Sequence, residues 1–138
     1  MLFYDLDLGA WVRSPGSQSP PQMVPCLTIG GVYQIEAAFT KGEAVQNLSG
    51  GTFFGGVKIK SDYAGEALAS DSSPSQNGDE SIVFSLDLTT DSAKSYFVAN
   101  PTADTASAVF VIAATVDGVE FKTSPFELVI QNDYFPQS

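Results

Sequence analysis

The feature that most constrains the fold is a long apolar segment, residues 106–116 (ASAVFVIAATV), followed by Asp117-Gly118 and a strand-like return at 119–123. An Asp-Gly pair readily takes the positive φ angles of a two-residue type I′ turn, which joins antiparallel strands. The near-continuous apolar character of the first segment predicts burial on both faces, or a place at the centre of a sheet. The sequence therefore predicts a β-hairpin in the core of the protein.

Other segments alternate apolar and polar residues, or are rich in strand-forming residues, as half-buried strands do. They are 2–8, 23–29, 32–39, 44–48, 50–60, 81–88 and 126–131. Pro25 places the second of them at a sheet edge, because proline cannot donate to a ladder. Gly55 and Gly56 predict a bulge or a close approach of another group to the backbone. The polar stretch 61–80 is expected to be a surface loop.

One segment, 89–101 (TTDSAKSYFVANP), breaks the alternation and predicts a short helix near 91–99. Thr90 or Asp91 can cap its start, and Pro101 follows its end. Three residues would form its packing face: Ala93, Tyr96 and Phe97.

About eight strands with one helix predict a mainly β protein, an antiparallel two-sheet β-sandwich that is Ig-like or jelly-roll-like. A small closed barrel is the alternative. The length of 138 residues suits one domain with one core. Within it we expect residues 1–31, an N-terminal strand with a Pro-rich loop, to serve as a docking segment, and 132–138 to form a C-terminal tail.

The charge balance excludes several kinds of partner. Six Lys and Arg stand against 16 Asp and Glu, for a formal net charge of −10. Nucleic acids and anionic membranes both require basic surfaces, so neither is an expected partner. The N-terminal residues lack the basic start of a signal peptide, and no apolar run approaches a membrane span of about 18 residues. We expect synthesis in a cytoplasm, and a single cysteine excludes an intrachain disulfide.

No arrangement of residues indicates catalysis or cofactor binding. The chain has no histidine, which excludes Ser-His-Asp and Cys-His machinery and histidine metal sites. Cys26 is expected to be a buried, inert thiol, and Asp5 and Asp7 to share the solvent face of a strand. An EF-hand loop begun at Asp71 fails at its sixth and twelfth positions, which leaves another kind of calcium site in 61–80 open. We therefore predict that the chain is not an enzyme and holds no metal or cofactor.

Aromatic residues near loops and termini are the candidate interaction residues, because exposed rings anchor partners or stack on sugars. The alternative is that they pack beneath loops. The candidates are Phe3, Tyr4, Trp11, Tyr63, Tyr134 and Phe135.

Four short motifs occur in a recognisable order: Gly56-Val57-Lys58, Leu88-Thr89-Thr90, Asp117-Gly118 and Asn132-Asp133. Between residues 32 and 133 this order resembles a loose family of small β-sandwich proteins found among the tail and fibre genes of phages and prophages. The N-terminal domain of baseplate upper proteins looks like a similar module. The first thirty residues have no counterpart in that pattern.

The resemblance implies a non-enzymatic virion protein, a tail, neck or fibre/baseplate attachment component that acts by protein–protein assembly. It implies assembly in the host bacterial cytoplasm, localisation to the virion, and contacts with other virion proteins and with copies of itself, as a trimer or hexamer. A capsid decoration protein and a carbohydrate-binding receptor-recognition module are the alternatives.

Overall fold

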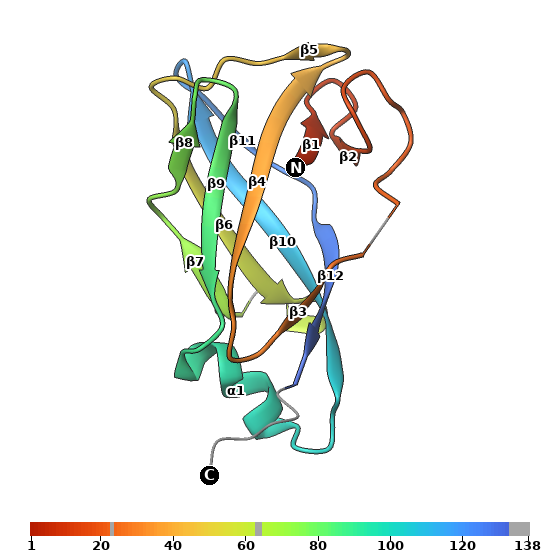
Figure 1. Cartoon of the computed structure of the whole chain (residues 1–138), viewed down its shortest axis with the longest axis vertical. Coiled ribbons are helices and arrows are strands. Elements are labelled where there is room, and N and C mark those ends of the chain that lie inside the picture. The colour runs from red at the N-terminus through yellow and green to blue at the C-terminus, as the bar shows by residue number, and fades with distance from the viewer. Residues whose placement is uncertain (23, 63–64, 133–138) are drawn as a thin grey trace.

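The computed structural model describes residues 1–22, 24–62 and 65–132. In these residues two β-sheets pack face to face, with one α-helix at one end of the pair (Figure 1). The predicted mainly β, two-sheet sandwich with one helix is thus confirmed. In chain order the elements are β1 (Leu2–Asp5), β2 (Ala10–Val12), β3 (Cys26–Thr28), β4 (Val32–Lys41), β5 (Ala44–Val45), β6 (Thr52–Ile59), the 3-10 turn η1 (Lys60–Asp62), β7 (Ala69–Asp71), β8 (Ser75–Asn77), β9 (Ser81–Asp87), α1 (Asp91–Ala99), β10 (Thr105–Val116), β11 (Val119–Lys122) and β12 (Phe126–Gln131).

The strands divide evenly between two sheets. Sheet A has the order β2-β1-β4-β9-β8, with β5 paired to β4, and sheet B has the order β3-β12-β10-β6-β7, with β11 paired to β10. Most neighbours are antiparallel, but β1 lies parallel to β4 and β3 lies parallel to β12. The strand number exceeds the expected eight because β2, β7 and β8, with three residues each, lie outside the segments that were predicted as strands.

The core lies between the sheets and is built from the inward-facing positions of the longest strands. Phe84 of β9 meets Phe110 of β10 edge to face, with ring centroids 5.5 Å apart, and Phe39 of β4 is equally buried. Each such side chain contributes about 1.5–3 kcal/mol through burial. The predicted hairpin is confirmed, since β10 and β11 join at Asp117 and Gly118, both with positive φ.

The helix forms where the sequence predicted it. The Thr90 hydroxyl accepts a hydrogen bond from the Ala93 amide at 3.1 Å, which satisfies one of the free donors of the first turn. Ala93 and Phe97 are buried and Tyr96 is half-buried, as the expected packing face requires. No helix in the described part of the chain is long and apolar enough to cross a membrane.

One open side of the sandwich is closed by the segment that was expected to be only a loop. Residues 61–80 include the edge strands β7 of sheet B and β8 of sheet A, which corrects that expectation. These strands carry polar, largely exposed side chains because they pair through the backbone at sheet edges. Asp71 joins the two sheets, since its Oδ2 accepts a hydrogen bond from the Ser85 amide of β9 at 2.9 Å.

The opposite side is closed by the N-terminal hairpin of β1 and β2. The Trp11 indole Nε1 donates to the Ser124 carbonyl at 2.7 Å, and the Ser124 amide donates to the Tyr4 hydroxyl at 3.1 Å. The two aromatic rings meet edge to face at 5.1 Å. Sheet A is therefore tied to the C-terminal strands of sheet B by residues more than 110 positions apart in sequence.

Asp5 ends β1 earlier than the alternation predicted. Its Oδ1 accepts hydrogen bonds from the amides of Asp7 and Leu8, at 2.9 and 3.0 Å, and so shapes the turn into β2. Asp5 is 2% exposed, which corrects the expectation that it lies on a solvent face. Its carboxylate serves the backbone of this turn.

A β-bulge separates β11 from β12 along the same side of β10. Residues 123–125 lie opposite only Val111 and Ile112, because Lys122 pairs with Ala113 and Phe126 pairs with Phe110. The Ile112 amide donates to the Thr123 hydroxyl at 3.0 Å, while the Thr123 amide donates to the Ile112 carbonyl at 2.9 Å. A side-chain oxygen thus replaces the carbonyl that a regular ladder would supply.

We expect Thr123→Val to lower the free energy of unfolding by about 1–3 kcal/mol, because it leaves the buried Ile112 amide without an acceptor. Thr40→Val is the matched control, since the buried Thr40 Oγ1 has no hydrogen-bond partner among the described residues. Removing that hydroxyl should leave stability unchanged or raise it by about 1 kcal/mol. Urea unfolding followed by circular dichroism measures both, and equal losses in the two variants would contradict the role given to Thr123.

Candidate interaction surface

The outer face of sheet B carries Phe54, the one exposed aromatic side chain among the described strands. The register of the sheet arranges its outward side chains in rows across β6, β10 and β11. One row consists of Phe54, Ala113 and Lys122, and the next consists of Thr52, Thr115 and Glu120. Phe54 is 44% exposed, although large aromatic side chains are usually buried.

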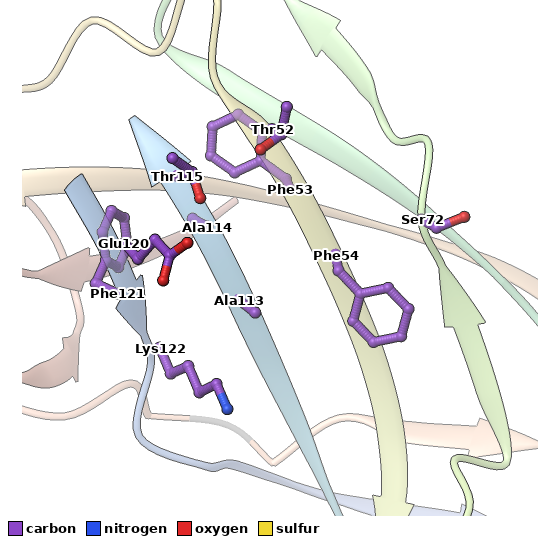
Figure 2. Close-up of a pocket in the computed structure, with 10 residues that line it drawn as sticks. All are labelled: Thr52, Phe53, Phe54, Ser72, Ala113, Ala114, Thr115, Glu120, Phe121 and Lys122. Carbon is purple, nitrogen blue, oxygen red and sulfur yellow. The ribbon is translucent and has the colours of Figure 1, made fainter. Parts of the chain in front are cut away.

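A shallow depression of about 680 Å³ lies over these rows. Figure 2 shows the Phe54 ring on one side and the Glu120 and Lys122 side chains on the other, with Ala113 and Thr115 between them. The hollow exists because the two central side chains are small. Its floor is apolar and its rim carries hydroxyl and charged groups, as contact surfaces for proteins or sugars do.

Outside the depression, toward α1, charged side chains lie on the same face of sheet B. Val109 lies in a row between Lys58 and Glu127, and Lys60 forms an ion pair with Glu127. Val109 is only 2% exposed although it points outward. The surface near α1 is therefore charged, whereas the surface around Phe54 is apolar.

Basic residues concentrate on this face. Three of the chain's six basic residues, Lys58, Lys60 and Lys122, lie there with two of its sixteen acidic residues, Glu120 and Glu127. The face thus carries a net charge of +1, and the remainder of the chain carries −11. The outer face of sheet B is therefore a weakly basic region of a protein that is otherwise acidic.

The outer face of sheet A has the opposite character. The outward positions of β4 and β9 include Glu36 and Asp87 and no basic residue. Hydrogen bonds from the Ser81 hydroxyl and the Asn77 side-chain amide lower the pKa of Glu36, and hydrogen bonds from Thr89 lower the pKa of Asp87. Both carboxylates therefore stay charged to lower pH than free ones do.

The structure corrects the exposed positions expected for Tyr4 and Trp11. They are 5% and 6% exposed and lie in the core, where both form hydrogen bonds with the backbone of Ser124. Phe3 is half-buried on the outer side of β1, in register with Ala38 and Val12. Tyr63, Tyr134 and Phe135 lie outside the described residues.

Cys26 is exposed, which corrects the expectation of a buried thiol. It starts the edge strand β3 with Leu27 turned inward, so its own side chain points to the outer side beside Gln131. The strand was predicted, but its short length leaves the first residue uncovered.

Sequence reasoning missed Phe54 as a surface residue, although a signal was present. Phe53 and Phe54 are consecutive in a strand, and consecutive strand residues point to opposite faces. With one ring in the core, at 6% exposure, the other must lie outside.

The described residues contain no group of three His, Cys, Asp or Glu side chains placed to hold a metal ion. Buried polar groups instead serve the fold. Asp5 shapes a turn, Thr123 completes the bulge, and Ser81 donates to Glu36 at 2.6 Å.

Comparison with known proteins gives likenesses to solved structures alone. No family model and no curated protein matches the chain. Among solved structures, the N-terminal domain of phage TP901-1 ORF48 is similar with a TM-score of 0.45 and 11% sequence identity, over 96% of this chain and 95% of that one. That domain comes from a phage protein, and a likeness of this degree assigns the chain to no family.

Proposed function

We propose that this chain is a non-enzymatic structural protein of a bacteriophage particle, a tail, neck or fibre/baseplate attachment component that works through protein–protein contacts. The observation that carries the proposal is the uncovered outer face of sheet B. There the exposed Phe54 ring and the small residues Ala113 and Thr115 form an apolar hollow with a polar rim. An aromatic side chain over a flat, rigid sheet is a typical anchor of a protein interface.

The sequence motifs also support the proposal through their places in the fold. Gly56-Val57-Lys58 lies in β6 just before the polar segment, and Leu88-Thr89-Thr90 leads from β9 into α1. Asp117-Gly118 forms the turn after the longest strand, and Asn132 follows β12. Strand, polar segment, strand, helix and hairpin follow one another as in the phage and prophage family that the sequence resembles.

Particles purified from the host that carries the gene provide the test. Mass spectrometry should find the chain at stoichiometric copy number, and Phe54→Asp should reduce its incorporation at least tenfold. Val98→Asp is the matched control, because Val98 is 77% exposed on α1, away from sheet B. Absence of the wild-type chain from intact particles would refute the proposal.

Copy number separates this proposal from its structural alternative. A tail, neck or baseplate component should occur in a handful to dozens of copies per particle, whereas a capsid decoration protein should occur in hundreds. Labelled antibody seen by electron microscopy then places the chain on the tail or on the head.

A carbohydrate-binding module is the second candidate, and the hollow itself favours it. A sugar ring could stack on Phe54 and bond to the hydroxyls of Thr52 and Thr115 at the rim. A glycan array with the wild-type chain and Phe54→Ala decides the matter. Binding that is lost in the variant supports this candidate, and no binding excludes it.

A further inference from the structure

We propose that copies of this chain stack in one orientation, with the outer face of sheet B of one copy on the outer face of sheet A of the next. The inference deepens the proposed assembly function, on which it rests, by naming the two surfaces and their direction. It depends on three properties of the faces: charge, the position of apolar residues, and area.

The charges of the two faces favour contact between sheet B of one copy and sheet A of the next over contact between like faces. Two copies that each carry −10 repel one another when acidic surfaces meet. The outer face of sheet B carries +1, and the outward positions of β4 and β9 carry −2 from Glu36 and Asp87. Contact between these faces joins opposite charges, whereas a two-fold contact would set sheet B against sheet B, or sheet A against sheet A, with like net charge.

The direction follows from how charged and apolar groups are placed along each face. On sheet B, Lys58 lies near the end of β6 next to α1, and Phe54 lies toward the other end. On sheet A, Asp87 is the last residue of β9 before α1, and Phe3 lies at the far end, paired with Ala38 late in β4. Stacking in the same orientation therefore brings the Lys58 end of one face to the Asp87 end of the other, and the Phe54 end to the Phe3 end.

The faces are large enough for a specific contact. The strands β3, β12, β10, β6 and β7 contain 3, 6, 12, 8 and 3 residues, so at about 3.3 Å per residue and about 4.8 Å between strands they cover on the order of 500 Å². Two such faces in contact bury about 1,000 Å² in total, which is near the lower limit of specific interfaces. A contact of this kind uses different surfaces on the two copies, so it builds a ring or an open stack rather than a closed dimer.

Sedimentation of the full chain tests the stack. The wild type should form species larger than a dimer at about 0.15 M salt, where a Debye length of about 8 Å screens the repulsion between the net charges of two copies more than it screens charges in direct contact. Phe54→Asp damages only the sheet B face, and Gln34→Lys damages only the sheet A face, where Gln34 is exposed between Val32 and Glu36. Each variant alone should associate at least tenfold more weakly.

An equimolar mixture of the two variants is the decisive sample. Phe54→Asp keeps an intact sheet A face and Gln34→Lys keeps an intact sheet B face, so the mixture should form one-to-one dimers and stop there. Dimers in the mixture also establish that both variants are folded. Val98→Asp and Lys94→Gln each change the charge on α1 by one unit, as the two test variants do on their faces, and should stack like the wild type.

A wild-type chain that stays monomeric at about 0.15 M salt and high concentration would overturn the inference, as would a mixture that forms no dimers. The proposed function would survive either result if the chain is found in particles. Conversely, stacking in solution by a chain absent from particles would support the inference and refute the function.

Discussion

Replacing Trp11 by alanine should lower the free energy of unfolding by about 3–5 kcal/mol. The ring is 6% exposed and packs edge to face on Tyr4 and Phe126, with ring centroids 5.1 and 5.4 Å apart. Its removal leaves a cavity between the two sheets and frees the Ser124 carbonyl, which accepts from the indole nitrogen. Both losses weaken the contact by which the hairpin of β1 and β2 closes one side of the sandwich.

Two further variants separate the parts of this effect. Trp11→Phe keeps most of the packing but removes the hydrogen bond, and should lose about 1–2 kcal/mol. Phe54→Ala removes an exposed ring and should change stability by less than about 0.5 kcal/mol. Trp11 is the only tryptophan, so unfolding in urea is best followed by circular dichroism in all variants. A loss below about 1 kcal/mol for Trp11→Ala would mean that this side of the sandwich is open.

Gly55→Ala should lower the free energy of unfolding by about 1–3 kcal/mol, because the inward side of β6 has no room for a methyl group. An added Cβ would lie 2.5 Å from Phe84 Cδ1 and 3.1 Å from Phe110 Cε1. Both rings are fully buried and cannot move aside without disturbing the core. The close approach that the sequence predicted is found here, and the register of β6 with β10 runs without a bulge.

The next residue supplies the control. An added Cβ at Gly56 would meet its nearest neighbour, Ala67 Cβ, at 3.6 Å, an ordinary contact. Gly56→Ala should therefore leave stability unchanged or raise it slightly, since glycine weakens a strand interior. Adding Phe84→Leu to Gly55→Ala should recover part of the loss, because the two residues share one space. Equal stability of both alanine variants would disprove the overpacking argument.

Local signals explain what the sequence predicted correctly. The helix from Asp91 has a capping threonine before it, and Pro101 follows soon after its end. The hairpin at Asp117 has the turn residues that its geometry requires. The strands β4, β9, β10 and β12 carry apolar residues at inward positions. Each of these features is set by neighbours within a few residues.

Long-range pairing explains what the sequence did not reveal. The residues of β8, Ser75 to Asn77, are all exposed, so no apolar alternation marks them as a strand. They form one because β9 offers an unpaired edge. From the sequence alone Tyr4 and Trp11 were expected to be exposed, because their partner, Ser124, lies near the other end of the chain. Likewise, the candidate surface depends on the row that joins Phe54, Ala113 and Lys122 from three strands.

The closure between Trp11 and Ser124 has a consequence for biosynthesis. The strand β1 can pair with β2 and β4 early, but its contacts with the segment before β12, and the pairing of β3 with β12, form only when the last strands exist. Such distant contacts make folding slow, and a nascent chain on the ribosome leaves Tyr4 and Trp11 without their partner Ser124 until the last strands have emerged. Folding of this domain is therefore expected to be completed only after β12 has left the ribosome.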